Sequence, residues 1–255
     1  MALVVIDRPA PNVARICINR PERRNAFNPE VREALIAAYS DAIGDETVHG
    51  IVMGSANGVF CAGGDVTGMK EGAADSARKR MARNHNFCRM LIECPKPVVA
   101  AIEGFAVGAG CGFALMADTI VLGENAVMGI PFFKLGLVPD YAIFHLLPRR
   151  VGQAKARQIL LYGRNYKGKA AHDLGLADEL LPDAQVAARA VELALELASQ
   201  PKNAFAITKM QLAIYPQSLD ASLEMENMAQ SLSMTTEDHR EGKAAFLEKR
   251  KAKFK

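Results

Sequence analysis

A glycine-rich segment near the middle of the chain has the composition of a backbone anion site. Residues 97–102 are apolar and β-branched, which predicts a buried strand, and residues 113–116 are typical of a helix. Between them lies Val107-Gly108-Ala109-Gly110-Cys111-Gly112. A turn that opens a helix leaves backbone N–H groups without partners, and these point at an approaching negative oxygen. The segment therefore predicts an oxyanion hole made without a charged side chain.

A second glycine turn stands upstream of the first. Residues 51–54 predict a strand, and Asn57-Gly58 predicts a turn. The segment Phe60-Cys61-Ala62-Gly63-Gly64-Asp65-Val66 then predicts another glycine turn that opens a short helix. Two such turns can supply two N–H donors to one oxygen, so the pair is a more specific signal than either turn alone.

Together these two turns resemble those of the crotonase, or enoyl-CoA hydratase/isomerase, superfamily. The segment from Ile18 to Asn28 is similar to the CoA-binding segment of that family, and Glu241 to Arg250 matches its C-terminal pattern. The resemblance implies an α/β fold, a crotonase-like spiral of repeated ββα units with a C-terminal helical region. It also implies that Gly64 and Ala109 each give one backbone N–H to the thioester carbonyl of an acyl-CoA.

The resemblance implies a set of substrate contacts as well. CoA is expected to lie along the segments at 26–27 and 62–66, with basic side chains near its phosphates. The expected substrate-binding residues are Arg24, Ala26, Phe27, Ala62, Gly64, Asp65, Val66, Pro131, Phe132, Leu135 and Lys249. No cofactor is expected beyond the CoA moiety of the substrate.

The carboxylates distinguish between the reactions of the family. Its hydratases hold a water molecule between two glutamates, and the matching positions here carry Gly112 and Phe132. Asp140 falls instead where family members that move double bonds keep a single catalytic acid. One carboxylate suffices for that shift, because it can take a proton from the carbon next to the thioester and return one two carbons further along.

Asp140 also has a structural interpretation. An aspartate that follows Pro139 and precedes a helix predicted from Tyr141 is a good N-cap, and capping hydrogen bonds would lower its pKa. Apolar neighbours such as Phe132 would raise that pKa by desolvation. His145, about one helical turn further on, is either a second proton donor or a packed histidine.

These residues predict an acyl-CoA enzyme, in the first place a 3-enoyl-CoA to 2-enoyl-CoA isomerase with Asp140 as acid and base. The first alternative is an enoyl-CoA hydratase in which Asp140 and His145 orient water. The second is an acyl-CoA-binding protein without catalysis, because both hydratase glutamates are absent. The glycines at 108, 110 and 112 do not follow the G-x-G-x-x-G order, which argues against a dinucleotide fold.

The chain is expected to divide near residue 200. Residues 1–200 are predicted to form the acyl-CoA-binding core, with a recurring strand, strand, helix pattern, and residues 201–255 a helical oligomerisation region. Helices are predicted over 29–42, 109–116 and 185–198 and from residue 141 onward, and residues 72–77 are expected to form a loop over the acyl chain. The apolar positions of the tail are too few for a core of their own, and the resemblance implies a homotrimer or hexamer.

Composition excludes several other classes. Half of the 255 residues are hydrophobic, which excludes general disorder, and the net charge of +3 without interleaved aromatic residues argues against nucleic acid as a partner. Neither the five cysteines nor the five histidines have metal-ligand spacing. The longest apolar run, 104–117, is shorter than the roughly 20 residues of a membrane span. With no secretory signal pattern at its start, the chain is expected to be cytoplasmic.

Overall fold

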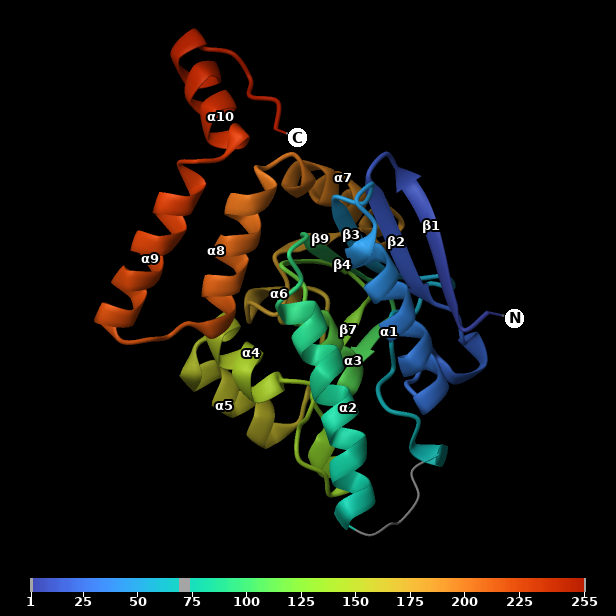
Figure 1. The fold of residues 1–255 in the computed structure, drawn as a ribbon. Coiled ribbons are helices and arrows are strands. Elements are labelled where there is room, and N and C mark those ends of the chain that lie inside the picture. The colour runs from blue at the N-terminus through green and yellow to red at the C-terminus, as the bar shows by residue number, and fades with distance from the viewer. Residues whose placement is uncertain (1, 69–73, 255) are drawn as a thin grey trace.

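A computed structural model describes residues 2–68 and 74–254 of the chain (Figure 1). The strands are β1 (Val4–Ala10), β2 (Val13–Ile18), β3 (Gly50–Ser55), β4 (Val98–Ile102), β5 (Phe105–Val107), β6 (Thr119–Gly123), β7 (Val127–Gly129), β8 (Asn165–Lys167) and β9 (Glu179–Leu181). The α-helices are α1 (Pro29–Gly44), α2 (Ala74–Ile92), α3 (Ala109–Ala114), α4 (Ile143–Val151), α5 (Gln153–Tyr162), α6 (Lys169–Asp173), α7 (Asp183–Ala198), α8 (Lys202–Ile214), α9 (Leu219–Ser233) and α10 (Glu237–Glu248). Short 3-10 helices are η1 (Pro21–Arg23), η2 (Val66–Gly68) and η3 (Phe132–Leu135).

The strands form two sheets, and consecutive strands of the chain alternate between them from β4 to β7. The larger sheet has the order β1-β2-β3-β4-β6-β9, in which β1 is antiparallel to β2 and the other pairs are parallel. The smaller sheet has the order β5-β7-β8, and Cys61 adds a parallel bridge to Ala106 of β5. Successive repeats therefore give one strand to each sheet, β4 and then β5, β6 and then β7. The bridge brings the turns that follow Cys61 and β5 next to each other.

Strand β4 separates the two hydrophobic clusters of the protein. Because side chains alternate along a strand, Val98 and Ile102 belong to the larger cluster, whereas Val99 and Ala101 belong to the smaller one, which α7 covers. A strand that is buried on both faces has a continuous apolar sequence, which explains why residues 98–102 contain no polar side chain.

The larger cluster is centred on Phe113 of α3. The rings of Phe27, Tyr39, Phe60 and Phe87 lie with their centroids 5.4–6.2 Å from that of Phe113. Aromatic pairs of this kind contribute about 0.5–1.5 kcal/mol each beyond the area they bury. The cluster therefore holds the six residues of α3 firmly, and with them the glycine turn that precedes the helix.

The start of α1 agrees with the sequence prediction, and the start of α4 differs from it. The side chain of Asn28 accepts a hydrogen bond from Val31 N at 2.8 Å and caps α1, as predicted. The helix predicted from Tyr141 instead begins at Ile143, because Tyr141 and Ala142 have φ of 53° and 58° and cannot continue a right-handed helix. Of the predicted loop at 72–77, residues 74–77 belong to α2, and 72–73 lie outside the described residues.

The C-terminal helices extend away from the sheets (Figure 1). Helix α8 is attached to the core by Lys209, whose Nζ lies 2.7 Å from Asp118 Oδ2 and donates to the carbonyl of Lys96. Helix α9 packs on α8, and α10 projects beyond both (Figure 1). These helices expose large apolar side chains, including Leu219, Leu223, Met228, Leu232, Phe246 and Leu247. Within residues 2–68 and 74–254, no helix combines the length and the apolar character that crossing a membrane requires.

Candidate active site

The two glycine turns pack backbone against backbone. A Cβ on Gly63, whose φ is +110°, would lie 2.8 Å from the carbonyl oxygen of Val107. A Cβ on Gly110 would lie 2.3 Å from the carbonyl oxygen of Cys61. A side chain at either glycine would therefore push the turns apart, which explains why these two positions carry none.

Each turn leaves one N–H free next to the other turn. On either side of Gly64, the carbonyl of Gly63 accepts from Phe27 N and Asp65 N donates to the carbonyl of Phe27, both at 2.7 Å. Ala109 is the first residue of α3, so its N–H has no acceptor within the helix. Among the described residues, neither Gly64 N–H nor Ala109 N–H has a hydrogen-bond acceptor. Two uncommitted donors thus border the same space.

That space is a cavity of about 910 Å³, a size typical of sites for small molecules. Its walls come from both glycine turns, from α1 and α2, and from the segment between η3 and α4. Most of the predicted catalytic and substrate-binding residues line it: Phe27, Ala62, Gly64, Asp65, Val66, Ala109, Pro131, Phe132, Leu135 and Asp140.

Three predicted binding residues do not line the cavity. The guanidinium of Arg24 lies over the ring of Phe105 at 5.7 Å, and the Arg24 carbonyl accepts from Ala62 N. Ala26 is buried, and its carbonyl accepts from Arg20 Nη1. Lys249 is exposed at the end of α10. Its predicted contact is with the CoA of a neighbouring subunit.

Asp140 has the environment of a base that is active near neutral pH. Its Oδ1 is buried and has no hydrogen-bond partner among the described residues. Burial raises the pKa of Asp140 to about 6, opposed by its own backbone N–H and by the positive charges of Arg80 and Arg32. A carboxylate with a pKa close to the operating pH is well matched to proton transfer.

The N-cap interpretation of Asp140 is wrong. The N-cap of α4 is Ala142, which makes no side-chain capping bond. Ile143 N donates to the backbone carbonyl of Asp140 at 3.3 Å, so the helix end is satisfied without the carboxylate. The reason is the left-handed backbone of Tyr141 and Ala142, which moves the helix start two residues beyond the predicted position.

The other carboxylate on the cavity wall, Asp65, is occupied. Its Oδ1 accepts from the Oγ1 and the backbone N of Thr67, and its Oδ2 lies 2.7 Å from Arg20 Nη1. The hydroxyl of Thr67, together with Arg20, lowers the pKa of Asp65 to about 2. Asp65 is therefore ionised and held in place, which suits a structural role in its turn.

The hydratases of the family carry glutamates at two positions that hold Gly112 and Phe132 in this chain. Position 112 has no room for a glutamate, and position 132 is apolar. A Cβ on Gly112 would lie 2.6 Å from the Cβ of Tyr141, whose ring stacks on Phe27 with centroids 5.3 Å apart. The Cβ and the carbonyl oxygen of Tyr141, together with the side chain of Ile143, thus occupy the space that a side chain at position 112 would need. Phe132 places an aromatic ring on the cavity wall.

His145 is not brought to the cavity. Its Nε2 lies 3.1 Å from the carbonyl oxygen of Ala213 in α8. Burial and the charge of Arg149 lower the pKa of His145. Of the two interpretations left open by the sequence, the described residues support the packed histidine.

The cysteines near the turns are packing residues. Burial raises the pKa of Cys61 and that of Cys111 to about 12, so both thiols stay protonated at neutral pH. In the part of the chain that the structure describes, no group of three or more metal-ligating side chains is placed to hold an ion.

Several cavity residues were not predicted from the sequence, namely Arg32, Arg80, Met81, Asn84, Leu137 and Val138. One of them had a signal. Arg32 is three residues before Leu35 and seven before Tyr39, so it shares the buried face of α1 with two fully buried side chains. A charged residue on the apolar face of a helix is unusual and indicates a polar partner or a ligand.

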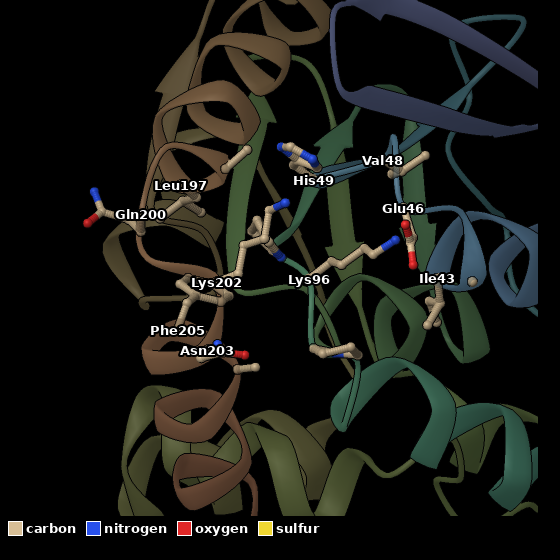
Figure 2. A pocket seen from close by; sticks show the side chains of 15 residues that line it. Ile43, Glu46, Val48, His49, Lys96, Leu197, Gln200, Lys202, Asn203 and Phe205 are labelled. Carbon is tan, nitrogen blue, oxygen red and sulfur yellow. The ribbon is translucent and has the colours of Figure 1, made fainter. Parts of the chain in front are cut away.

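A second cavity, of about 380 Å³, lies between the end of α1 and the junction of α7 with α8 (Figure 2). Figure 2 shows the side chains of Lys96, Lys202 and His49 around it. The Nζ of Lys96 donates to the carbonyls of Ala42 and Asp45, so this lysine holds the end of α1. None of the predicted site residues lines this cavity, and the larger one is the candidate active site.

Comparison with known proteins agrees with the geometry. The family model for enoyl-CoA hydratase/isomerase matches residues 9–255. The 1,2-epoxyphenylacetyl-CoA isomerase of Escherichia coli is 34% identical over 95% of this chain and 94% of its own length. The crotonyl-CoA hydratase of Syntrophomonas wolfei is also 34% identical, over 95% of this chain and 94% of its own.

Solved structures give the same result for the fold. The crystal structure of an enoyl-CoA hydratase from Bacillus anthracis superposes with a TM-score of 0.92 at 27% identity, covering 100% of this chain and 99% of that chain. The predicted α/β spiral with a helical C-terminal region is thereby confirmed. The chain belongs to the enoyl-CoA hydratase/isomerase family of the crotonase superfamily.

Proposed function

We propose that this enzyme moves a double bond within an acyl-CoA thioester, from the 3 position to the 2 position, with Asp140 as the acid and base. The proposal rests on the state of one carboxylate. Of the two carboxylates that line the described part of the cavity, only that of Asp140 has a buried oxygen, Oδ1, without a hydrogen-bond partner, and burial raises the pKa of Asp140 to about 6. The other, Asp65, is bound by Arg20 and Thr67.

In the proposed reaction, Asp140 takes a proton from the carbon next to the thioester carbonyl. The electron pair moves onto the carbonyl oxygen and gives a dienolate, and the N–H groups of Gly64 and Ala109 donate hydrogen bonds to that oxygen. Asp140 then returns a proton to the carbon two positions further along, which leaves the double bond conjugated with the thioester. A donor of this kind typically lowers the barrier by about 3–4 kcal/mol.

Water addition is the second candidate, and a relative favours it, since the crotonyl-CoA hydratase of Syntrophomonas wolfei is as similar as the isomerase from Escherichia coli. In this chain Asp140 would have to orient the water alone. Position 112 has no room for a glutamate beside Tyr141, and His145 is engaged with Ala213. The one unpaired carboxylate on the described wall therefore fits a proton shuttle better than a two-carboxylate water site.

Turnover of matched substrates tests the proposal. Purified enzyme is incubated with a 3-enoyl-CoA and, separately, with the 2-enoyl-CoA of the same length. We expect the 3-enoyl-CoA to gain the absorbance of a conjugated thioester without a change in mass. A product heavier by one water molecule from either substrate would favour the hydratase. Tight binding with no turnover of either would support an acyl-CoA-binding protein without catalysis.

We also propose that the enzyme works as a homotrimer or a dimer of trimers, in which Lys249 reaches the CoA of a neighbouring subunit and Arg24 lies near its phosphates. The exposed apolar side chains of α9 and α10 support this, because Phe246 is 84% exposed and Met228 66% exposed in the single chain. Light scattering at micromolar concentration is expected to give at least three times the mass of the monomer, and a stable monomer would contradict the proposed trimer.

Because basic side chains are proposed to meet the phosphates of CoA, the affinity for CoA is expected to fall with rising salt concentration.

A further inference from the structure

Arg32 is a charged side chain on the cavity wall that the proposed reaction does not use. It lies on α1 and is only 7% exposed, yet it borders the cavity that contains Asp140. A guanidinium keeps its positive charge at any physiological pH, and removing a charge from water is costly. A buried arginine therefore requires compensation from an anion or from several acceptors.

The compensation supplied by the protein is incomplete. Arg32 Nη1 donates to Asn84 Oδ1 at 2.5 Å, and Asn84 is itself buried and neutral. Arg32 Nε is buried and has no acceptor. Within residues 2–68 and 74–254, no carboxylate forms an ion pair with Arg32. The guanidinium edge made by Nε and Nη2 is the edge that binds a carboxylate through two hydrogen bonds, and no described residue accepts from it.

The charges of the described residues around the cavity leave a positive excess. Arg80 of α2 also lines the wall. Against these two guanidinium groups, the described part of the wall sets one unpaired carboxylate, that of Asp140, since Asp65 is paired with Arg20. His85, on the same helix as Arg80, is a further basic group close enough to act on Asp140. Both arginines also act on the charge of Asp140, so they lie within electrostatic range of that carboxylate.

We propose that Arg32 and Arg80 bind a carboxylate carried by the acyl group, so that the substrates are CoA monothioesters of dicarboxylic acids. This inference rests on the proposed function of the cavity. The bond from Arg32 to Asn84 restrains the guanidinium at the cavity wall, and Arg80 adds a second positive charge. An uncharged acyl chain would leave the buried guanidinium without compensation, and such a chain would bind less well.

Two thioesters of equal length provide the kinetic test, the CoA ester of 3-hexenoic acid and the CoA monoester of 3-hexenedioic acid. We expect kcat/KM of the wild type to be at least about tenfold higher for the ester with the second carboxylate, as a charge-assisted bond in a buried site implies. Arg32→Met is expected to abolish this ratio, and Arg32→Lys to retain part of it. Arg83→Met, an exposed arginine of α2 that does not line the cavity, is the matched control and keeps the ratio.

The ratio separates binding of the acyl carboxylate from an effect of Arg32 on Asp140. A changed pKa of Asp140 alters the turnover of both esters alike, whereas the loss of a carboxylate contact alters only one. If the wild type treats the two esters equally, or prefers the methyl-ended one, the inference is overturned and the isomerase proposal is not. If Arg32→Met does not fold, the wild-type ratio and Arg80→Met decide the question.

A binding measurement tests recognition of the acyl carboxylate independently of the reaction. Saturated hexanoyl-CoA and adipoyl-CoA have no double bond to move, and calorimetric titration gives the affinity of the wild type for each. Tighter binding of adipoyl-CoA by at least about tenfold would support the inference even if no enoyl-CoA were turned over. Equal affinities would overturn it even in an active isomerase.

Discussion

Two turns of this protein have nearly the same backbone, and only one of them borders the cavity. Gly108 connects β5 to α3 with φ 57° and ψ −121°, and Gly168 connects β8 to α6 with φ 41° and ψ −111°. Each glycine N–H donates at 2.8 Å to a carbonyl across the turn, that of Gly129 for the first and that of Ala126 for the second. Both short helices therefore begin with the same set of uncommitted N–H groups.

The difference lies in what faces each turn. A Cβ on Gly108 would come 4.0 Å from the Cα of Gly63 in the second glycine turn, and beyond it is the cavity. A Cβ on Gly168 would strike the carbonyl oxygen of Glu124 at 2.1 Å, and the next side chain, Lys169, pairs with an exposed aspartate. The turn is thus a local structure, whereas the candidate oxyanion hole is a product of two repeats stacking against each other.

Removing one N–H from each turn gives the largest expected contrast. Proline is tolerated at the first position of a helix, where it deletes an N–H that has no helical acceptor. Ala109→Pro is expected to lower kcat for an enoyl-CoA by about 10²–10³-fold, the typical cost of losing one oxyanion donor. Lys169→Pro, the same change in the matched turn, is expected to leave kcat within about twofold. Steady-state kinetics of the two variants, with circular dichroism as a check of the fold, gives the comparison.

Equal losses in both variants would show that proline acts through the fold and not through the oxyanion. Full activity of Ala109→Pro would remove Ala109 N–H from the proposed mechanism.

Adding a methyl group to each turn is expected to have the larger effect at the Gly168 turn, and the effect is on stability. Gly108→Ala and Gly168→Ala share the strain of a positive φ, about 1–3 kcal/mol. The second also drives a Cβ into the backbone of Glu124. Urea unfolding is therefore expected to show a greater loss of unfolding free energy for Gly168→Ala, the turn without a proposed function. Equal losses would mean that the two turns are packed alike.

Ionised Asp140 is expected to lower the free energy of unfolding at neutral pH. Its pKa in the folded state, about 6, is above the ordinary value of 3.8, so the folded state holds the proton more tightly than the unfolded state does. Its effect on stability is absent below about pH 4, and the folded state loses stability as the pH rises through 6. Asp140→Asn is expected to raise the unfolding free energy at pH 7 by on the order of 1–3 kcal/mol.

Urea unfolding of both proteins at pH 7 and near pH 4 checks this. The advantage of the variant should shrink at the lower pH, and an advantage that is the same at both would contradict the assignment of the shifted carboxyl to Asp140.

Local sequence patterns were enough to predict the turns. Glycine at positions 63 and 110 marks close backbone contact, Asn28 before Pro29 marks a helix start, and Asp140 follows an apolar segment that ends in proline. These features depend on neighbours in the chain, which is why the sequence contains them.

The remaining wall of the cavity depends on contacts across the fold. Asn84 becomes a site residue only because α2 packs beside α1 and brings it to Arg32. Tyr141 and Ala142 have a left-handed backbone although neither is a glycine, so the sequence does not indicate this conformation. The conformation moves the start of α4. That shift removes Asp140 from its predicted capping role, which no local pattern indicates.

Proton exchange tests most directly whether Asp140 is the base that works with the two backbone donors. Wild type and Asp140→Asn are incubated with a 3-enoyl-CoA in D₂O, and deuterium in the thioester is followed by mass spectrometry. The asparagine keeps the shape of the side chain but cannot accept the proton. We expect the wild type to incorporate deuterium while it forms the 2-enoyl-CoA, and the variant to lose both activities by about 10²-fold or more with its CoA affinity nearly unchanged. Wild-type rates of exchange in Asp140→Asn would contradict the account.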